Sequence, residues 1–79
     1  MNKYSNEVEK FLKEFILPKM GLSEYNEDNI GDIVDFISSE YETPLAIAED
    51  SGDILTDDEK KLLELSTKAV TEITSSKDW

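Results

Sequence analysis

The chain contains no cysteine, no histidine and no arginine. Without cysteine it has neither a disulfide nor a thiolate metal ligand to support a small core, and the reducing cytoplasm is the compartment we expect. Without histidine it lacks the commonest metal ligand and the commonest general base near neutral pH. Without arginine it cannot make bidentate hydrogen bonds to phosphate. These absences argue against an enzyme and against a cofactor or metal site.

Long apolar runs are also absent, so no segment has the length needed to cross a membrane. The beginning of the chain does not have the composition of a secretory leader. With 79 residues the chain is close to the lower size limit at which one core is sufficient for folding. We therefore expect a single soluble domain over residues 1–79.

The charge is distributed unevenly along the chain. Residues 1–20 contain four lysines and three acids, a net of +1, and residues 60–79 have the same balance. Residues 21–59 contain thirteen acids and no base, so this segment has a formal charge of −13. The net charge of the whole chain is −11, because the segments on either side contribute +1 each. Nucleic acids and anionic membranes attract lysine and arginine, so we expect direct binding to neither. A basic protein is the partner that this charge favours.

Apolar residues recur at helical spacing, and no segment has the alternating pattern of a strand. The spacing predicts an all-α fold, a small compact bundle of three main helices plus a short helix that comes third along the chain. The helices should lie near residues 6–20, 27–42, 44–50 and 57–75, and residues 75–79 should form a frayed tail. The predicted core is Val8, Leu12, Phe15, Ile33, Val34, Ile37, Leu62, Ala69, Val70 and Ile73.

Capping residues indicate where the helices begin and end. The expected starts are Asn6 with Glu9 as a capping box, Asn26 or Asn29 as an N-cap, Thr43 as an N-cap before Pro44, and Thr56 with Glu59 as a stronger capping box. Gly21 and Gly52 should allow the chain to turn after two of the helices.

The stretch AEDSGDILTDDEKKLL, residues 48–63, has part of the spacing of a calcium-binding EF-hand loop. With Gly52 at the sixth position of that loop, Ile54 stands at the eighth and Asp58 at the twelfth. The first position is then Ile47, which has no side-chain oxygen to offer a cation. Because half of the motif is missing, we interpret the stretch as a helix end, a turn and a helix start, with no metal site.

The segment DIVDFISSEYETPL, residues 32–45, resembles in outline the acyl carrier proteins, which are also small, acidic and four-helical with a short third helix. The serine that carries the prosthetic group of that family lies in an Asp-Ser-Leu motif at the start of the second helix. The corresponding segment here, NEDNIGD, has no serine. We therefore expect no prosthetic group, and no catalytic or nucleotide-binding motif indicates an enzyme.

Seven or eight acids stand where folding alone would not place them. Carboxylates at the C-terminal ends of helices oppose the helix dipole, and Asp28, Asp32 and Asp35 share an outer helix face without a lysine. Phe36 borders that face on a helical wheel, either as an interface anchor or as a residue packed against a neighbouring helix. The predicted partner-binding residues are Asp28, Asp32, Asp35, Phe36, Glu40, Glu42, Glu49, Asp50 and Asp53.

The leading hypothesis is therefore a small acidic module of the inhibitor, immunity or antitoxin type, encoded by a bacterium or a phage. It would cover a basic, nucleic-acid-binding surface of another protein by imitating a nucleic-acid backbone. Colicin-nuclease immunity proteins are similar in size, acidity and helix number, although their Tyr-Tyr-Pro segment is absent here. One alternative is a structural subunit of a homo-oligomer or larger assembly. Another is a low-affinity divalent-cation binder that uses residues 49–58.

Overall fold

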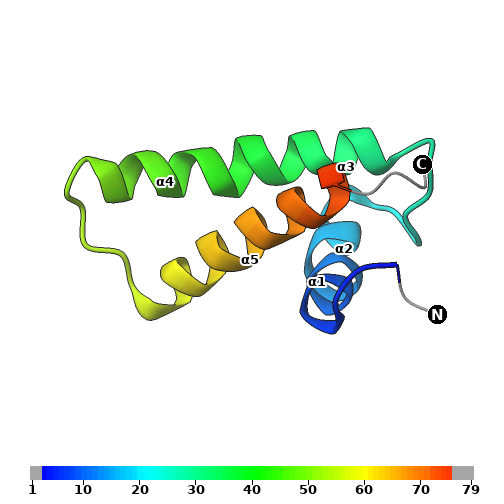
Figure 1. The fold of residues 1–79 in the computed structure, drawn as a ribbon, viewed down its shortest axis with the longest axis horizontal. Helices are drawn as coiled ribbons and strands as arrows, with labels where there is room; N and C mark the ends of the chain where they lie inside the picture. The colour runs from blue at the N-terminus through cyan, green and yellow to red at the C-terminus, as the bar shows by residue number, and fades with distance from the viewer. Residues whose placement is uncertain (1–2, 76–79) are drawn as a thin grey trace.

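A computed structural model describes residues 3–75, and all regular structure within them is helical (Figure 1). Three continuous helices are present: α1 (Asn6–Phe11), η1 (Leu12–Ile16) and α2 (Leu17–Met20) form the first, α3 (Ile30–Ile37), η2 (Ser38–Glu42) and α4 (Thr43–Asp50) form the second, and α5 (Asp57–Ser75) is the third. The segments η1 and η2 are π-helical turns. The predicted all-α bundle is thus confirmed. Except for Ser75, the tail predicted to fray lies outside the described residues.

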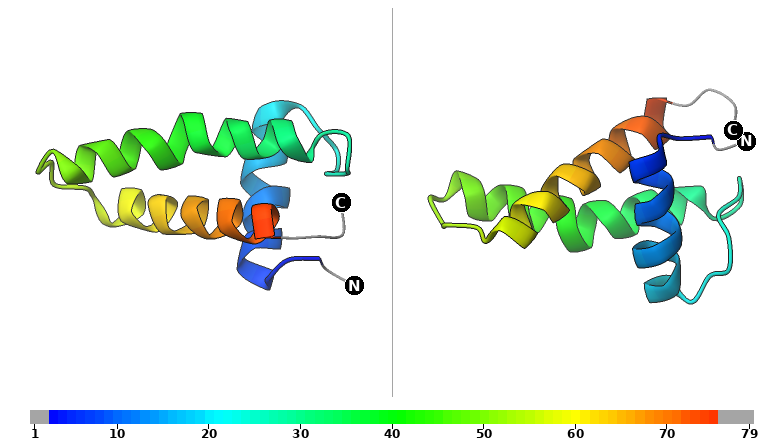
Figure 2. Two further views of the ribbon diagram at one scale, coloured as in Figure 1. Left: turned by 45° about the horizontal axis from the view of Figure 1, so that its top comes forward. Right: turned by 90° about the horizontal axis from the view of Figure 1, so that it is seen from below.

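The second helix spans the length of the molecule, and α5 runs back beside it in the opposite direction (Figure 1). α5 contacts α3, η2 and α4, so it packs against all three segments of the second helix. The first helix crosses this pair near the end where α3 begins and α5 finishes (Figure 2). The result is a body of 38 × 24 × 20 Å with its core at that crossing and a two-helix hairpin extending away from it.

The prediction that Thr43 is the N-cap of a separate short helix is wrong. Thr43 has helical backbone angles, φ −65° and ψ −49°, and its N–H donates to the carbonyl of Ser38, five residues back. A proline ring clashes with the carbonyl four residues before it in a regular α-helix, and a π-turn widens the helix at that place. The helix therefore continues through Pro44 into α4. The residue before Pro18 makes the same five-residue bond at the end of η1.

The core confirms the apolar pattern of the sequence. Six of the ten predicted core residues are buried, namely Val8, Leu12, Ile33, Ile37, Ala69 and Ile73. The other four, Phe15, Val34, Leu62 and Val70, are half-buried against them. Tyr4, Phe11, Ile16, Leu17 and Ile30 complete the cluster. Because most of these side chains come from the first helix and from α3, the crossing of the helices is the best-packed part of the molecule.

The predicted capping boxes have different outcomes. At Thr56 and Glu59 the box is confirmed, because each backbone N–H donates to the other residue's side chain, at 3.0 and 3.1 Å. At Asn6 the prediction is wrong. Ser5, with an extended backbone, is the residue that precedes the helix, and Asn6 is already helical. The carboxylate of Glu9 does not bond to the backbone N–H of Asn6. It accepts hydrogen bonds from residues that precede the helix.

That carboxylate joins three parts of the chain. Glu9 is 3 % exposed, and its Oε2 accepts hydrogen bonds from the backbone N–H groups of Lys3 and Tyr4, both at 3.1 Å. It also accepts one from the Tyr25 hydroxyl at 2.6 Å. Its Oε1 makes no hydrogen bond and lies 3.5 Å from the ammonium of Lys13, which is four residues further along the same helix. The segment before α1 and the loop after α2 are therefore held by one buried charge.

Replacement of Ile37 by alanine should test the packing of the core. Ile37 is fully buried, so Ile37→Ala should lower the free energy of unfolding by about 2–5 kcal/mol in urea denaturation. Ile47 is the matched control because it is the same residue type in a helix but is 59 % exposed. Ile47→Ala should change stability by less than about 0.5 kcal/mol. Equal effects of the two substitutions would contradict the packing described here.

Replacement of Glu9 should remove a contribution to the free energy of unfolding that is present at neutral pH and lost at acid pH. Burial raises the pKa of the Glu9 carboxyl, but the hydrogen bonds from Tyr25 and Tyr4 and the charge of Lys13 outweigh it and hold the pKa below 4.5. A carboxyl with a lowered folded-state pKa stabilises the fold above its unfolded pKa, and this contribution is lost as pH falls through the folded value.

At pH 7, Glu9→Gln should therefore lower the free energy of unfolding by about 1–3 kcal/mol. The difference from the wild type should shrink as the pH falls below about 4, measured by urea denaturation at each pH. Tyr25→Phe removes one donor and should produce a smaller loss over the same pH range. A difference that is constant from pH 7 to pH 3 would show that the charge of Glu9 contributes nothing.

Candidate partner-binding surface

Eight of the predicted partner-binding residues are carboxylates, and all of them reach solvent. Together they are called the acidic surface: Asp28, Asp32, Asp35, Glu40, Glu42, Glu49, Asp50 and Asp53. Seven are exposed and Glu42 is half-exposed. Because the second helix is continuous, six of them belong to one helix, with Asp28 before its start and Asp53 after its end.

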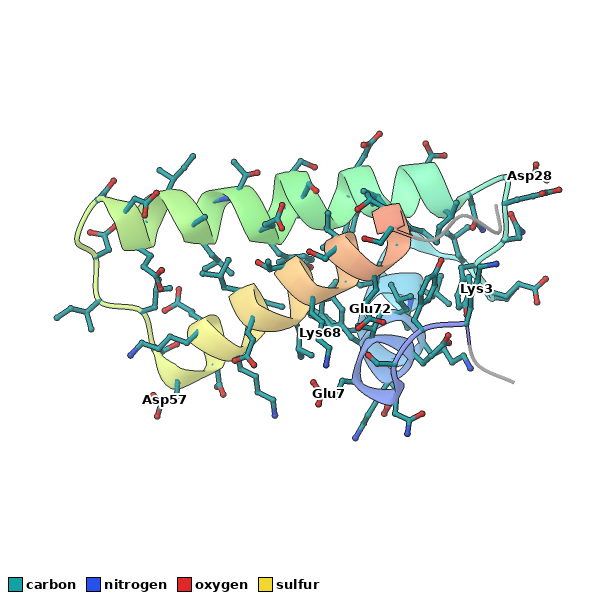
Figure 3. All side chains as sticks on the ribbon, in the orientation of Figure 1. Lys3, Glu7, Asp28, Asp57, Lys68 and Glu72 are labelled. Carbon is teal, nitrogen blue, oxygen red and sulfur yellow. The ribbon has the colours of Figure 1, made fainter. Side chains whose placement is uncertain are left out.

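The two ends of this surface are set by short-range hydrogen bonds. Before α3, the side chain of Asn26 accepts from the backbone N–H groups of Asp28 and Asn29, at 2.8 and 3.0 Å. After α4, the N–H of Asp53 donates to the carbonyl of Ala48 at 3.0 Å. Figure 3 shows Asp28 at one end of the molecule. At about 1.5 Å per helical residue the acids extend over roughly 30 Å, which is the dimension of a protein surface rather than of a small ligand.

Lysines do not neutralise the acidic surface. The ion pairs between described residues join Lys13 to Glu9 and Lys68 to Glu7, at 3.5 and 3.3 Å. Both pairs involve the first helix, and Figure 3 shows Lys68 and Glu7 on the side of α5 turned away from the second helix. The uneven charge of the sequence is therefore also uneven in space, because the second helix, Ile30 to Asp50, carries acids and no lysine.

Phe36 lies beneath the acidic surface rather than projecting from it. Its side chain is half-buried against the core, and its ring meets the edge of the Tyr41 ring with centroids 5.8 Å apart. Tyr41 in turn contacts Phe15 of the first helix at 5.3 Å. Phe36 therefore packs beside a ring of its own helix, and through Tyr41 it joins the aromatic contact with the first helix. Burial and the nearby Glu40 charge raise the pKa of Tyr41, so its hydroxyl stays protonated in the physiological range.

The stretch that partly resembles an EF-hand is a helix end followed by a helix start. Gly52 has φ +89°, a left-handed conformation that other residues adopt only with strain, and its N–H donates to the carbonyl of Glu49 at 3.1 Å. Four residues later the Thr56–Glu59 box starts α5. Hydrogen bonds from the backbone and side chain of Thr56 hold the pKa of Glu59 below its ordinary value. Within residues 3–75, no three carboxylates gather in an arrangement that could hold a metal ion.

Two exposed isoleucines were not among the predicted site residues. Ile54 is 95 % exposed and Ile47 is 59 % exposed, whereas the neighbouring Leu55 is buried. The sequence contained a signal for this, since ILT follows a glycine turn and one of two adjacent apolar residues must point outward if the other packs inward. Periodicity alone could not say which of the two would be outside.

A surface groove of about 580 Å³ lies between the first helix and α5. Phe11, Phe15 and Leu65 form its apolar lining, and Lys10 and Lys61 are among its charged residues. None of the predicted partner-binding residues lines this groove. This groove and the acidic surface are therefore separate parts of the molecule.

No protein-family model matches the sequence, and comparisons with curated protein sequences and with solved structures gave no match. Within the described residues, no helix combines the length and the apolar character required to span a bilayer.

Reversal of two acids on α3 should relieve repulsion in the free protein. Asp32 and Asp35 are exposed, and neither forms an ion pair with another described residue. Asp32→Lys combined with Asp35→Lys places two positive charges among the other acids of residues 21–59, so it should raise the melting temperature by roughly 1–3 °C at low salt. Salt screens such repulsion, so the gain should disappear as NaCl is raised to 1 M. A melting temperature that falls, or a gain that salt does not reduce, would show that these carboxylates are used in folding.

Proposed function

We propose that this chain is a small acidic binding module that covers a basic surface on another protein. The observation that supports the proposal is the position of eight solvent-accessible carboxylates, six on one continuous helix and one just beyond each of its ends, with no lysine or arginine between residues 21 and 59. Such a row presents a field to which a positively charged surface is attracted from a distance.

The acidic surface lowers the stability of the fold, which favours a binding role for it. Like charges on neighbouring helical turns repel, and acids in the last turn of a helix oppose its dipole. Glu49 and Asp50 occupy that place at the end of α4. A domain of 79 residues has little stability to lose, so this arrangement is more readily retained where the surface binds something.

The proposed role is that of an inhibitor, immunity protein or antitoxin. A row of acids of this length could occupy a site at which a partner binds nucleic acid. In this role the carboxylates imitate phosphates and occupy the basic surface of a cytoplasmic partner. The proposal includes neither an enzymatic activity nor a bound cofactor. The alternatives are a structural subunit of a homo-oligomer and a weak divalent-cation binder at residues 49–58.

The test begins with capture of proteins from a lysate of the organism that encodes the chain, at 50 mM and 500 mM NaCl. A basic protein retained only at low salt is the expected partner. With that protein, Asp32→Lys combined with Asp35→Lys should slow association by about tenfold or more in stopped-flow or biosensor measurements, because long-range attraction sets the rate of association.

The matched control is Glu14→Lys combined with Glu64→Lys. Both residues are exposed, and they lie on the first helix and α5, so this variant changes the net charge equally without altering the acidic surface. Its association rate should fall much less. Equal slowing by the two double variants would mean that net charge alone matters, and unchanged rates in both would contradict the proposal. Self-association without any partner would favour the oligomer.

A further inference from the structure

The end of the hairpin between α4 and α5 combines exposed apolar side chains with a high density of acids. Ile54 and Ile47 are the large apolar residues that are exposed within residues 3–75, and both belong to this end, at the opposite extreme of the molecule from α2 (Figure 1). An isoleucine left in water forgoes roughly 1.5–3 kcal/mol of burial free energy. In a small domain, this is a substantial loss at two positions, one in α4 and one in the loop that follows it.

The exposure of Ile54 follows from a fixed backbone. On one side, the turn at Gly52 is closed by the bond from the Asp53 N–H to the carbonyl of Ala48 at 3.0 Å. On the other side, Leu55 is 7 % exposed and packs inward, and the Thr56 capping box begins α5 directly afterwards. Ile54 is therefore held outward between two anchored positions. A side chain presented on an ordered loop loses little entropy on binding, which favours an anchoring role.

The charges around this end determine which partner it suits. Glu49, Asp50, Asp53, Asp57 and Asp58 are all exposed, and residues 21–59 contain no base. Such a surface is repelled by anionic lipid and by nucleic acid. It is complementary to an apolar pocket whose border carries lysine or arginine, because interfaces commonly have an apolar centre and a polar rim.

We propose that the end of the α4–α5 hairpin is the anchor of partner binding, with Ile54 and Ile47 entering an apolar pocket on a protein whose rim is basic. This inference rests on the proposed function and localises it. The acidic surface along the second helix attracts the partner, and the two isoleucines at its end hold it. The anchor is thus Ile54 and Ile47 in place of Phe36, which is already packed against Tyr41.

The test uses two designed peptides of equal length and equal positive charge as probes. One is an amphipathic helix of leucine and lysine, and the other has serine in place of every leucine. Binding is followed by amide chemical shifts of the isotope-labelled chain at low salt. The leucine–lysine peptide should bind about tenfold more tightly, with its largest shifts at residues 47–58, because only this peptide can cover the isoleucines.

Ile54→Ser should remove most of the tenfold difference in affinity between the two peptides and leave the affinity for the serine–lysine peptide unchanged. Ile54→Leu should retain most of the difference. Because residue 54 is almost fully exposed, both variants should melt at the wild-type temperature, which separates loss of binding from loss of folding.

Three results would overturn the anchor without contradicting the proposed function, and a fourth would overturn both. Equal affinities with shifts spread over residues 28–42 would leave the proposed electrostatic function standing without it. Shifts centred on the groove at Phe11, Phe15 and Leu65 would move apolar binding to another site. Concentration-dependent sedimentation of the wild type that Ile54→Ser abolishes would make the occupant a second copy. If the serine–lysine peptide also fails to bind, the proposed function fails together with the anchor.

Discussion

In η2 the N–H of Thr43 donates to the carbonyl of Ser38, and this five-residue step leaves room for the ring of Pro44. With the usual four-residue bond the ring would meet the carbonyl of Glu40, and the helix would have to kink or end. The π-turn keeps residues 30–50 in one helix, and α5 contacts all three segments of that helix. The length of the molecule, the line of acids and the position of the hairpin end all follow from this continuity.

The same continuity explains how a domain with so uneven a charge remains folded. Within residues 3–75 the lysines lie before or on the first helix and on α5, and Lys13 and Lys68 form ion pairs with acids of the first helix. The second helix contributes its apolar side, through Ile30, Ile33 and Ile37, to the core and exposes its acids to water, where their repulsion is screened. Burial of apolar surface thus offsets the repulsion, and the charges need no partner inside the chain.

Periodicity in the sequence was sufficient for the helices and the core, because an apolar stripe at helical spacing must face other stripes. Local capping rules succeeded where the cap is made by neighbours in sequence, as at Thr56. They failed at Asn6 because Glu9 bonds instead to Tyr25, sixteen residues away, a contact that no local pattern contains. They failed at Thr43 because a proline that usually starts or breaks a helix was accommodated by a change of helix type. Among the site residues, the sequence indicated exposed acids but could not show that Phe36 packs against Tyr41 or that Ile54, not Leu55, faces water.

Charge and apolar side chains have separate roles in the binding of one protein to another, and this chain exposes both kinds at the end of the hairpin. Carboxylates spread over roughly 30 Å act at a distance and set how fast a partner arrives, but each exposed pair contributes little once contact is made. Residence on a partner depends on apolar side chains that are desolvated at the centre of the contact. Ile54 and Ile47 are large, exposed and placed where the acids are densest. A partner drawn along the second helix would therefore be retained at the end of the hairpin, where the backbone already holds Ile54 in position.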